Sequence, residues 1–425
     1  MEFAAAASKN KFLSFGKKLS PRERVQNMHR PLWTHIPQLP LGERDRRWSA
    51  VHQKMKEAGL DCLLVWGTGR GEHLRYISLL GVRGVALVLS QRDPVVFTDG
   101  LVPAQYVRYC HNWVEEVRQD IENLPSALRD YGLDGATIGV VTSKSPQTRL
   151  PGEGGLPLAG WIQGALPRAK LVDATRLLEE LEMIKSPAEM EFLHRAAEIA
   201  YEVFEAMANA MRPGATEQEI YSRALAAQTA TGGDVTDIWL DVSSPPRLHG
   251  RFPPYSSRQI EKGDVLVTEY HTSYGGYLVA TEHTISLGEP AAELRQVHRV
   301  AEECFREGTA SMVVGAKFSD VIAAYRRPAD QGGMAYVELG VHGHGLRSCE
   351  VPSTVFGGKG GMLHQHRLAH IPDMALQENM VFGQNIDLHN PKWNPNAGVM
   401  LGNTIWVTKE GPTVLSRVPT ELTVV

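Results

Sequence analysis

The sequence predicts an α/β (α+β) fold with two domains, a smaller one with a mixed sheet and a larger one built around a long hairpin. The chain has 425 residues, which is too long for one ordinary hydrophobic core. In its first part, short apolar strands alternate with helical stretches. Further on, residues 263–284 form two extended runs joined at Gly275-Gly276. The expected division is an N-terminal arm (1–45), a mixed α/β domain (46–175) and a larger domain (176–425).

The composition is that of a soluble globular protein, with 43% hydrophobic and 22% charged residues. A net charge of −4 gives no reason to expect nucleic acid or an anionic membrane as a partner. No run of about eighteen apolar residues predicts a membrane span, and the N-terminus lacks the pattern of a secretory signal. We therefore expect a cytoplasmic protein that acts on a small molecule.

The cysteines Cys62, Cys110, Cys304 and Cys349 are widely spaced, and no CxxC pair occurs. We expect buried free thiols in a reducing compartment. A nucleophilic role is the alternative for Cys349, which is close to the candidate site in the sequence.

In the smaller domain an amphipathic helix is expected over residues 46–59, and the Gly/Pro-rich run 151–157 is expected to be a loop. Apolar, β-branched runs predict strands at residues 62–66, 84–90, 95–98 and 137–141.

The larger domain is expected to open with a capping box, in which Ser186 is the N-cap, Pro187 the first helical residue and Glu189 the third. The helix is expected to run to about Ala210. A second capping box at Thr216 is expected to start the next helix.

The hairpin and the Ser186 helix start together resemble the creatinase, aminopeptidase P and prolidase superfamily, over roughly residues 46–415. The resemblance implies the pita-bread fold for the larger domain and a creatinase-type N-terminal domain. In the peptidases of that family two Asp, one His and two Glu hold two metal ions. Carried onto this chain, those positions are Glu269, Ala280, His344, Asn385 and Gly402. A pair of divalent cations needs several anionic ligands, so a dinuclear metallopeptidase is not expected.

The hairpin is more similar to that of creatinase, a metal-free member of the family. Ala280 and Glu282 match its pattern, and His249 matches the histidine that shuttles a proton there. Arg83 lies where creatinase uses an arginine of the partner subunit to bind the substrate carboxylate, which implies a homodimer with the site near the interface. Asn385 departs from the glutamate of creatinase and makes creatine itself a poor candidate.

The sequence thus predicts a metal-independent hydrolase that cleaves a C–N bond in a small polar substrate by His/Glu acid–base catalysis, without a cofactor or metal. The catalytic residues would be His249, Glu282 and His344, and the substrate-binding residues Glu269, His271, Asn385, Arg83 and Tyr277. Ordinary structural roles remain the alternative for each of them. The alternative functions are a metal-free lyase (elimination or retro-aldol cleavage) and a non-catalytic binding module. A rebuilt mononuclear site could use Glu269, His271, His344 and His389.

Overall fold

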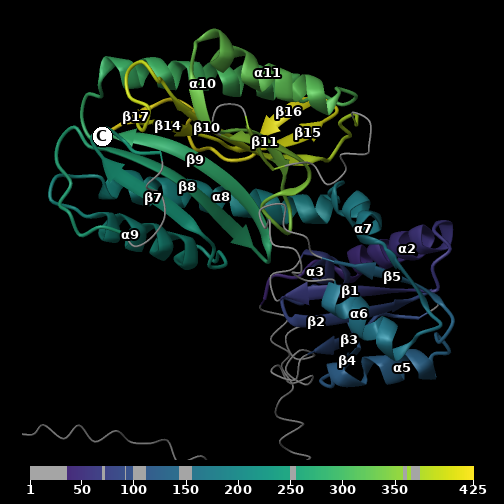
Figure 1. Cartoon of the computed structure of the whole chain (residues 1–425). Coiled ribbons are helices and arrows are strands. Elements are labelled where there is room, and N and C mark those ends of the chain that lie inside the picture. The colour runs from purple at the N-terminus through teal and green to yellow at the C-terminus, as the bar shows by residue number, and fades with distance from the viewer. Residues whose placement is uncertain are drawn as a thin grey trace, which may run out of the picture.

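The structure of the protein, a computed structural model, describes residues 36–68, 72–90, 92–98, 112–142, 156–248, 255–357, 361–364 and 374–425. These residues form two parts, which Figure 1 shows one above the other. The predicted fold class is confirmed. The predicted division at residue 175 stays a prediction.

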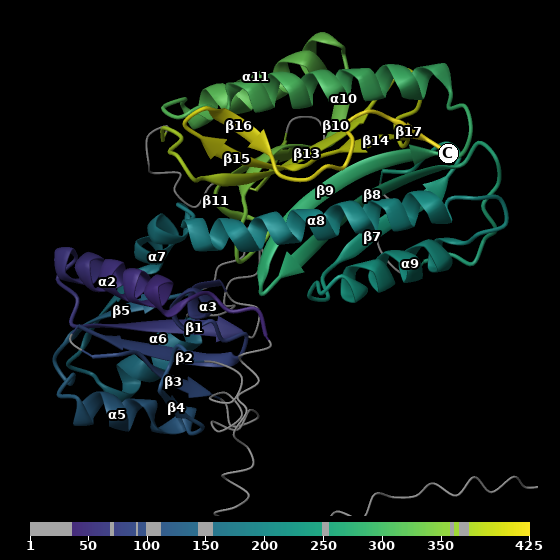
Figure 2. The same ribbon diagram turned by 180° about the vertical axis from the view of Figure 1, so that it is seen from behind.

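The first part is a six-stranded sheet in the order β4-β3-β2-β1-β5-β6, with helices on both faces. Alternate residues of a strand point to opposite faces. Accordingly, Leu63 and Val65 of β1 pack in the core beneath α2, whereas Cys62 and Leu64 pack in the core beneath α5 and α6. Figures 1 and 2 show α2, α3 and α7 between this sheet and the second part. The elements are α2 (Leu41–Glu57), β1 (Cys62–Thr68), α3 (Glu72–Ser78), β2 (Arg83–Leu89), β3 (Val95–Thr98), β4 (Glu116–Arg118), η2 (Ile121–Asn123), α5 (Leu124–Asp130), β5 (Thr137–Val141), α6 (Leu156–Ala165), β6 (Lys170–Asp173) and α7 (Thr175–Glu182).

The second part has two sheets between two pairs of helices, with α8 and α9 on one side and α10 and α11 on the other (Figure 1). One sheet has the order β17-β9-β8-β7, and the other runs β12-β11-β10-β13-β15-β16 with β14 paired to β13. Strand β8 is buried along almost its whole length, as expected for a strand covered on both faces. The elements are α8 (Pro187–Ala210), α9 (Glu217–Ala230), β7 (Ile238–Ser243), β8 (Val265–Tyr274), β9 (Tyr277–Ser286), α10 (Ala292–Ser311), α11 (Phe318–Gln331), β10 (Ala335–Gly343), β11 (Glu350–Gly357), β12 (Gly361–His364), β13 (Val381–His389), β14 (Gly398–Leu401), β15 (Thr404–Thr408), β16 (Gly411–Val414) and β17 (Thr423–Val424).

None of the helices that the structure describes is long and apolar enough to cross a membrane.

Several predicted elements differ from the observed ones at their ends. Strands β3 and β5 have the predicted bounds, but α2 begins at Leu41, inside the predicted arm, because Pro40 in extended backbone sets its start. Residues 1–35 lie outside the described residues. The same is true of most of the predicted loop 151–157, and α6 already begins at its residue 156.

The capping box at Ser186 is confirmed. Its hydroxyl accepts a hydrogen bond from Glu189 N (3.2 Å), and Glu189 Oε2 accepts one from Ser186 N (2.8 Å). At Thr216 half of the expected box forms, because the hydroxyl accepts from Glu219 N (3.1 Å) while the Glu219 carboxylate pairs with Arg212 (2.7 Å) instead. A competing cation therefore removed the reciprocal bond.

The two parts are joined by a fully buried guanidinium, that of Arg47 in α2. Within its own part, Arg47 donates to Glu43 Oε1 (2.7 Å) and to the backbone oxygen of Tyr76 (3.1 Å). Across the boundary it donates to the hydroxyl of Tyr277 on β9 (2.6 Å), and its Nη2 lies 3.2 Å from Oε1 of Glu189 at the start of α8. The guanidinium therefore fixes α2 against both α8 and the hairpin.

Replacement of Arg47 by Met should lower the free energy of unfolding by about 3–5 kcal/mol, because it removes the buried partner of the Glu43 and Glu189 carboxylates. The measurement is urea denaturation at pH 7 followed by tryptophan fluorescence. The matched control is Arg46→Met, since Arg46 pairs with the same Glu43 but is 45% exposed. We expect the control to cost less than about 1 kcal/mol; equal losses for both variants would contradict the assigned role of Arg47.

Candidate functional site

The site is organised by the hairpin of β8 and β9, whose register is fixed by its turn. Tyr274 pairs with Tyr277, and Gly275 and Gly276 between them have φ of 57° and 87°. A two-residue turn with positive φ at both positions favours glycine, because a side chain there would be strained. This register places Glu269 opposite Glu282.

Five of the sequence-predicted residues meet in one buried cluster on this hairpin and the neighbouring sheet: Glu269, His271, Glu282, His344 and Asn385. His271 Nε2 lies 3.9 Å from Glu269 Oε1, and the rings of His271 and His344 stack with centroids 6.2 Å apart. The edge of Trp239 also contacts the His271 ring, at a centroid distance of 5.5 Å. The ring of His271 is thus held between aromatic neighbours beside a carboxylate.

A further histidine, His342, completes the cluster, and the sequence analysis missed it. Its Nε2 is 2.8 Å from Oδ1 of Asn385, whose Nδ2 donates to Glu282 Oε1 (2.7 Å). Glu282 Oε2 accepts from the backbone N of Ile386 (3.1 Å). Because the Asn385 nitrogen is used by Glu282, its oxygen must accept, so that His342 carries its proton on Nε2. The available signal is the pair of histidines around one glycine, His342-Gly343-His344, at the end of β10.

His342 and His344 are neutral at neutral pH. Burial lowers the pKa of His344 well below its ordinary value, and the neighbouring His342 and His271 lower it further, against a smaller opposing effect of the Leu278 backbone. Burial also lowers the pKa of His342, which Glu269 and Asn385 partly oppose. On the other face of β9, burial beside His298 lowers the pKa of His283 to about 3.

The residues at the former ligand positions do not fit a pair of divalent metal ions. Ala280 has no ligand atom, and Asn385 is neutral and hydrogen-bonded on both sides of its amide. At Gly402, a Cβ atom would lie 2.3 Å from the Gln384 oxygen and 3.0 Å from Glu282 Oε2. The carboxylate of Glu282 therefore fills the space beside Gly402. Within the described ranges, no group of three or more His, Cys, Asp or Glu residues is arranged to hold a metal ion.

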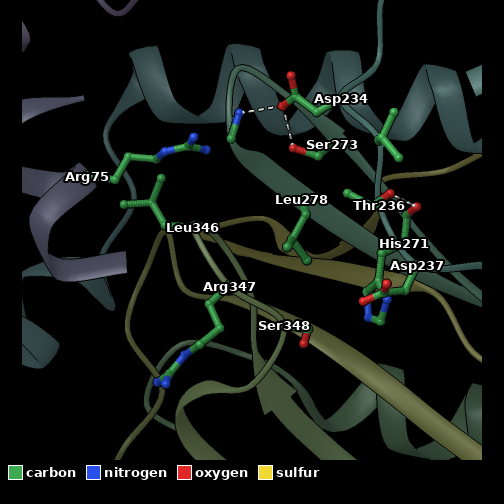
Figure 3. Close-up of a pocket in the computed structure, with 12 residues that line it drawn as sticks. Arg75, Asp234, Thr236, Asp237, His271, Ser273, Leu278, Leu346, Arg347 and Ser348 are labelled. Atoms are coloured by element: carbon green, nitrogen blue, oxygen red, sulfur yellow. Dashed lines mark hydrogen bonds between the residues drawn. The ribbon is translucent and has the colours of Figure 1, made fainter. Parts of the chain in front are cut away.

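A pocket of about 340 Å³ opens beside the cluster, and the side chain of His271 forms part of its wall (Figure 3). The other walls come from the segment before β7, from the loop after β10 and from α3 of the first part. Residues of these walls that the sequence analysis missed include Arg75, Asp234, Asp237, Leu346 and Arg347. No local pattern marks them, because long-range packing brings them together.

Three further predicted residues, Tyr277, Arg83 and His389, do not line this pocket. Tyr277 is fully buried, and its hydroxyl is held by Arg47 (2.6 Å) and Glu189 (3.1 Å), so it links the two parts of the molecule rather than contacting substrate. Arg83 is exposed at the start of β2, and its role across a subunit interface stays a prediction. His389 is about 13 Å along β13 from Asn385, away from the cluster. His249 lies outside the described residues.

The sequence and the fold have counterparts among known proteins. The sequence profile of metallopeptidase family M24 matches residues 191–409, and that of the creatinase/prolidase N-terminal domain matches residues 47–184. The probable dipeptidase PepE of Mycobacterium tuberculosis is 27% identical over 361 residues, which are 83% of this chain and 86% of that protein.

Solved structures share the fold at lower identity. The X-Pro aminopeptidase from Thermotoga maritima aligns with a TM-score of 0.71 at 21% identity, covering 89% of this chain and 99% of that one. The dipeptidase PepE from Mycobacterium ulcerans has a TM-score of 0.70 at 20% identity, covering 92% of this chain and 100% of that one.

These matches correct the predicted function. The metal-independent C–N hydrolase is wrong as a prediction, because the matching profile is that of a metallopeptidase family and the relatives carry the names of dipeptidases and aminopeptidases. The metal-free lyase and the non-catalytic module gain no support either. The prediction was wrong because it gave single ligand positions more weight than the similarity of the whole domain to the peptidases. The broader prediction of a hydrolase stands.

Because the ligand positions have changed, we expect the protein to retain fewer than two metal ions per chain after saturation with Mn²⁺ or Zn²⁺ and gel filtration. A metal pair needs bridging carboxylates to balance its charge, and Ala280, Asn385 and Gly402 offer none. Inductively coupled plasma mass spectrometry measures the content. Two retained ions per chain would contradict the account of these positions.

Below about pH 6.5 the protein should lose stability as the pH falls, because the unfolded chain takes up protons on histidines that stay neutral in the fold. For His283 this window extends down to a folded pKa of about 3. Urea midpoints at pH 7.5 and 5.5 measure the effect, and His283→Phe should show a smaller difference between them. An unchanged difference in this variant would show that His283 does not contribute.

Proposed function

The chain belongs to metallopeptidase family M24, and on this premise we propose that it hydrolyses an amide bond in a short peptide. The names of its relatives support this reaction, since they include dipeptidases and aminopeptidases. A pocket of about 340 Å³ suits a small ligand rather than a folded protein.

The observation that carries the proposal is the position of His271. Its side chain lines the pocket and also contacts the buried cluster, through Glu269 (3.9 Å) and the ring of His344. Glu282, by contrast, is 1% exposed and His344 is fully buried. His271 therefore contacts the substrate, whereas the other two act through their neighbours.

The role of each described side chain follows from its position. His271 hydrogen-bonds the scissile amide and can hold a proton on its imidazole, and Glu269 orients that ring from the side of Nε2. Trp239 and His344 keep the ring from rotating away. His342, Asn385 and Glu282 form a hydrogen-bonded row next to these rings, in which both ends of the Asn385 amide are used. This row holds the neighbouring part of the buried cluster in place. No step through a metal pair is derived, because the residues present do not fit one.

We also propose that the protein is a homodimer with the site near its interface and that it is located in the cytoplasm.

The test is hydrolysis of a panel of dipeptides and tripeptides, in the presence of Mn²⁺ or Zn²⁺, followed by mass spectrometry of the released amino acids. We expect turnover by the native protein. His271→Gln should lower kcat/KM on the order of 100-fold, because it removes a group that positions the reacting bond.

The matched control is His194→Gln. His194 is an exposed histidine on α8, outside the pocket, and its replacement should leave kcat/KM unchanged. The proposal fails if no peptide of the panel is cleaved, or if His271→Gln keeps the native rate.

A further inference from the structure

The pocket contains one charged group that comes from the other part of the molecule, the guanidinium of Arg75 in α3. It lies against the turn of the hairpin, where a Cβ atom at Gly276 would stand 1.6 Å from Arg75 Nη1. Any side chain at residue 276 would thus displace it. Figure 3 shows the Arg75 side chain extending from its helix toward the hairpin end of the pocket.

Arg75 is half-buried and makes no hydrogen bond or ion pair within the part of the chain that the structure describes. The charge of Asp234 acts on Arg75, but Asp234 Oδ2 already accepts from Ser273 Oγ (2.8 Å) and from Gly276 N (2.7 Å). A partly desolvated guanidinium whose donors are uncommitted is suited to bind an anionic oxygen pair, because its fork of N–H groups matches a carboxylate.

The hairpin sets the distance between this cation and His271. Arg75 contacts the turn at Gly276, and His271 pairs across the ladder with Ala280. Residues 277–279 of β9 lie between the two places, so four residue steps, about 13 Å of strand, separate them. A hydrogen bond of about 3 Å at each end takes up about 6 Å of this length. What remains corresponds to one or two residues of an extended peptide.

The walls between these two ends are apolar. Leu278 and Leu346 line the pocket, and Figure 3 places Leu278 between the Arg75 side and the His271 side and Leu346 beside Arg75. An apolar side chain of a bound peptide would fit against them.

We propose that Arg75 binds the C-terminal carboxylate of the substrate, so that the enzyme accepts short peptides with one or two residues between the scissile bond and a free C-terminus. This rests on the proposed function and adds the substrate class. It also makes the first part of the molecule a contributor to the site within the same chain.

The experiment compares kcat/KM for peptides with a free carboxylate and for the same peptides with a C-terminal amide, in the native protein and in Arg75→Gln. The native protein should prefer the acid by about 10- to 100-fold, the value of a hydrogen bond to a charged group. In Arg75→Gln the acid should lose that factor while the amide keeps its rate, so that the ratio falls to about one. A defect in folding alone would lower both rates and leave the ratio unchanged, which would overturn the proposal.

Arg168→Gln is the matched control, because Arg168 is an arginine of the first part of the molecule whose side chain is 77% exposed and lies outside the pocket. It should retain the native preference for the acid. A native protein that cleaves acid and amide equally would overturn the Arg75 assignment and leave peptide hydrolysis standing.

If no peptide is cleaved, equilibrium binding can still distinguish the carboxylate site from the proposed reaction. N-acetyl-leucine should bind the native protein more tightly than N-acetyl-leucinamide, and Arg75→Gln should remove the difference, as measured by calorimetry. If that difference is found while no peptide is cleaved, the carboxylate site stands and the proposed reaction fails. Equal binding of the two compounds to the native protein would overturn the carboxylate site.

Discussion

The buried guanidinium of Arg47 is the contact on which the shape of the pocket depends. Desolvation of an arginine is expensive unless its donors are all used, and here oxygens from both parts of the molecule use them. One of those oxygens is the backbone carbonyl of Tyr76, the residue next to Arg75. The same cation therefore orients the two parts and sets the helix turn that brings Arg75 into the pocket.

The opposite wall is held by a second buried ion pair. Lys185, in the connection before α8, lies 2.5 Å from Glu350 Oε2, and the other oxygen of Glu350 accepts from the backbone N of Leu346 (2.6 Å). Leu346 and Arg347 belong to the wall of the pocket. Both walls are thus tied by buried charges to the boundary between the parts, and a change in their relative orientation would alter the pocket from two sides.

The features that depend on neighbouring residues of the chain could be predicted from the sequence. The glycine turn, the Ser186 cap and the bounds of β3 and β5 follow from backbone and capping preferences, and all were found in the sequence. The Thr216 box was only half correct, because Arg212 competes for the Glu219 carboxylate. The sequence could not identify His342 and Arg75 as members of the site. His342 belongs to it because of its hydrogen bond to Asn385 on the neighbouring strand, and Arg75 because the two parts of the molecule pack against each other.

The close packing of Glu282 against Gly402 restricts the substitutions that this site can accept. The backbones of the two residues are bridged, and Glu282 Oε2 stands where a side chain at residue 402 would begin. A glutamate added at position 402 alone would meet both that oxygen and the Gln384 backbone, so a single substitution there is sterically closed. A smaller residue at position 282 would remove the contact with its carboxylate but not the closer contact with the Gln384 backbone. A carboxylate at residue 402, just after β14, therefore requires both the loss of the Glu282 carboxylate and a shift of the backbone at Gln384.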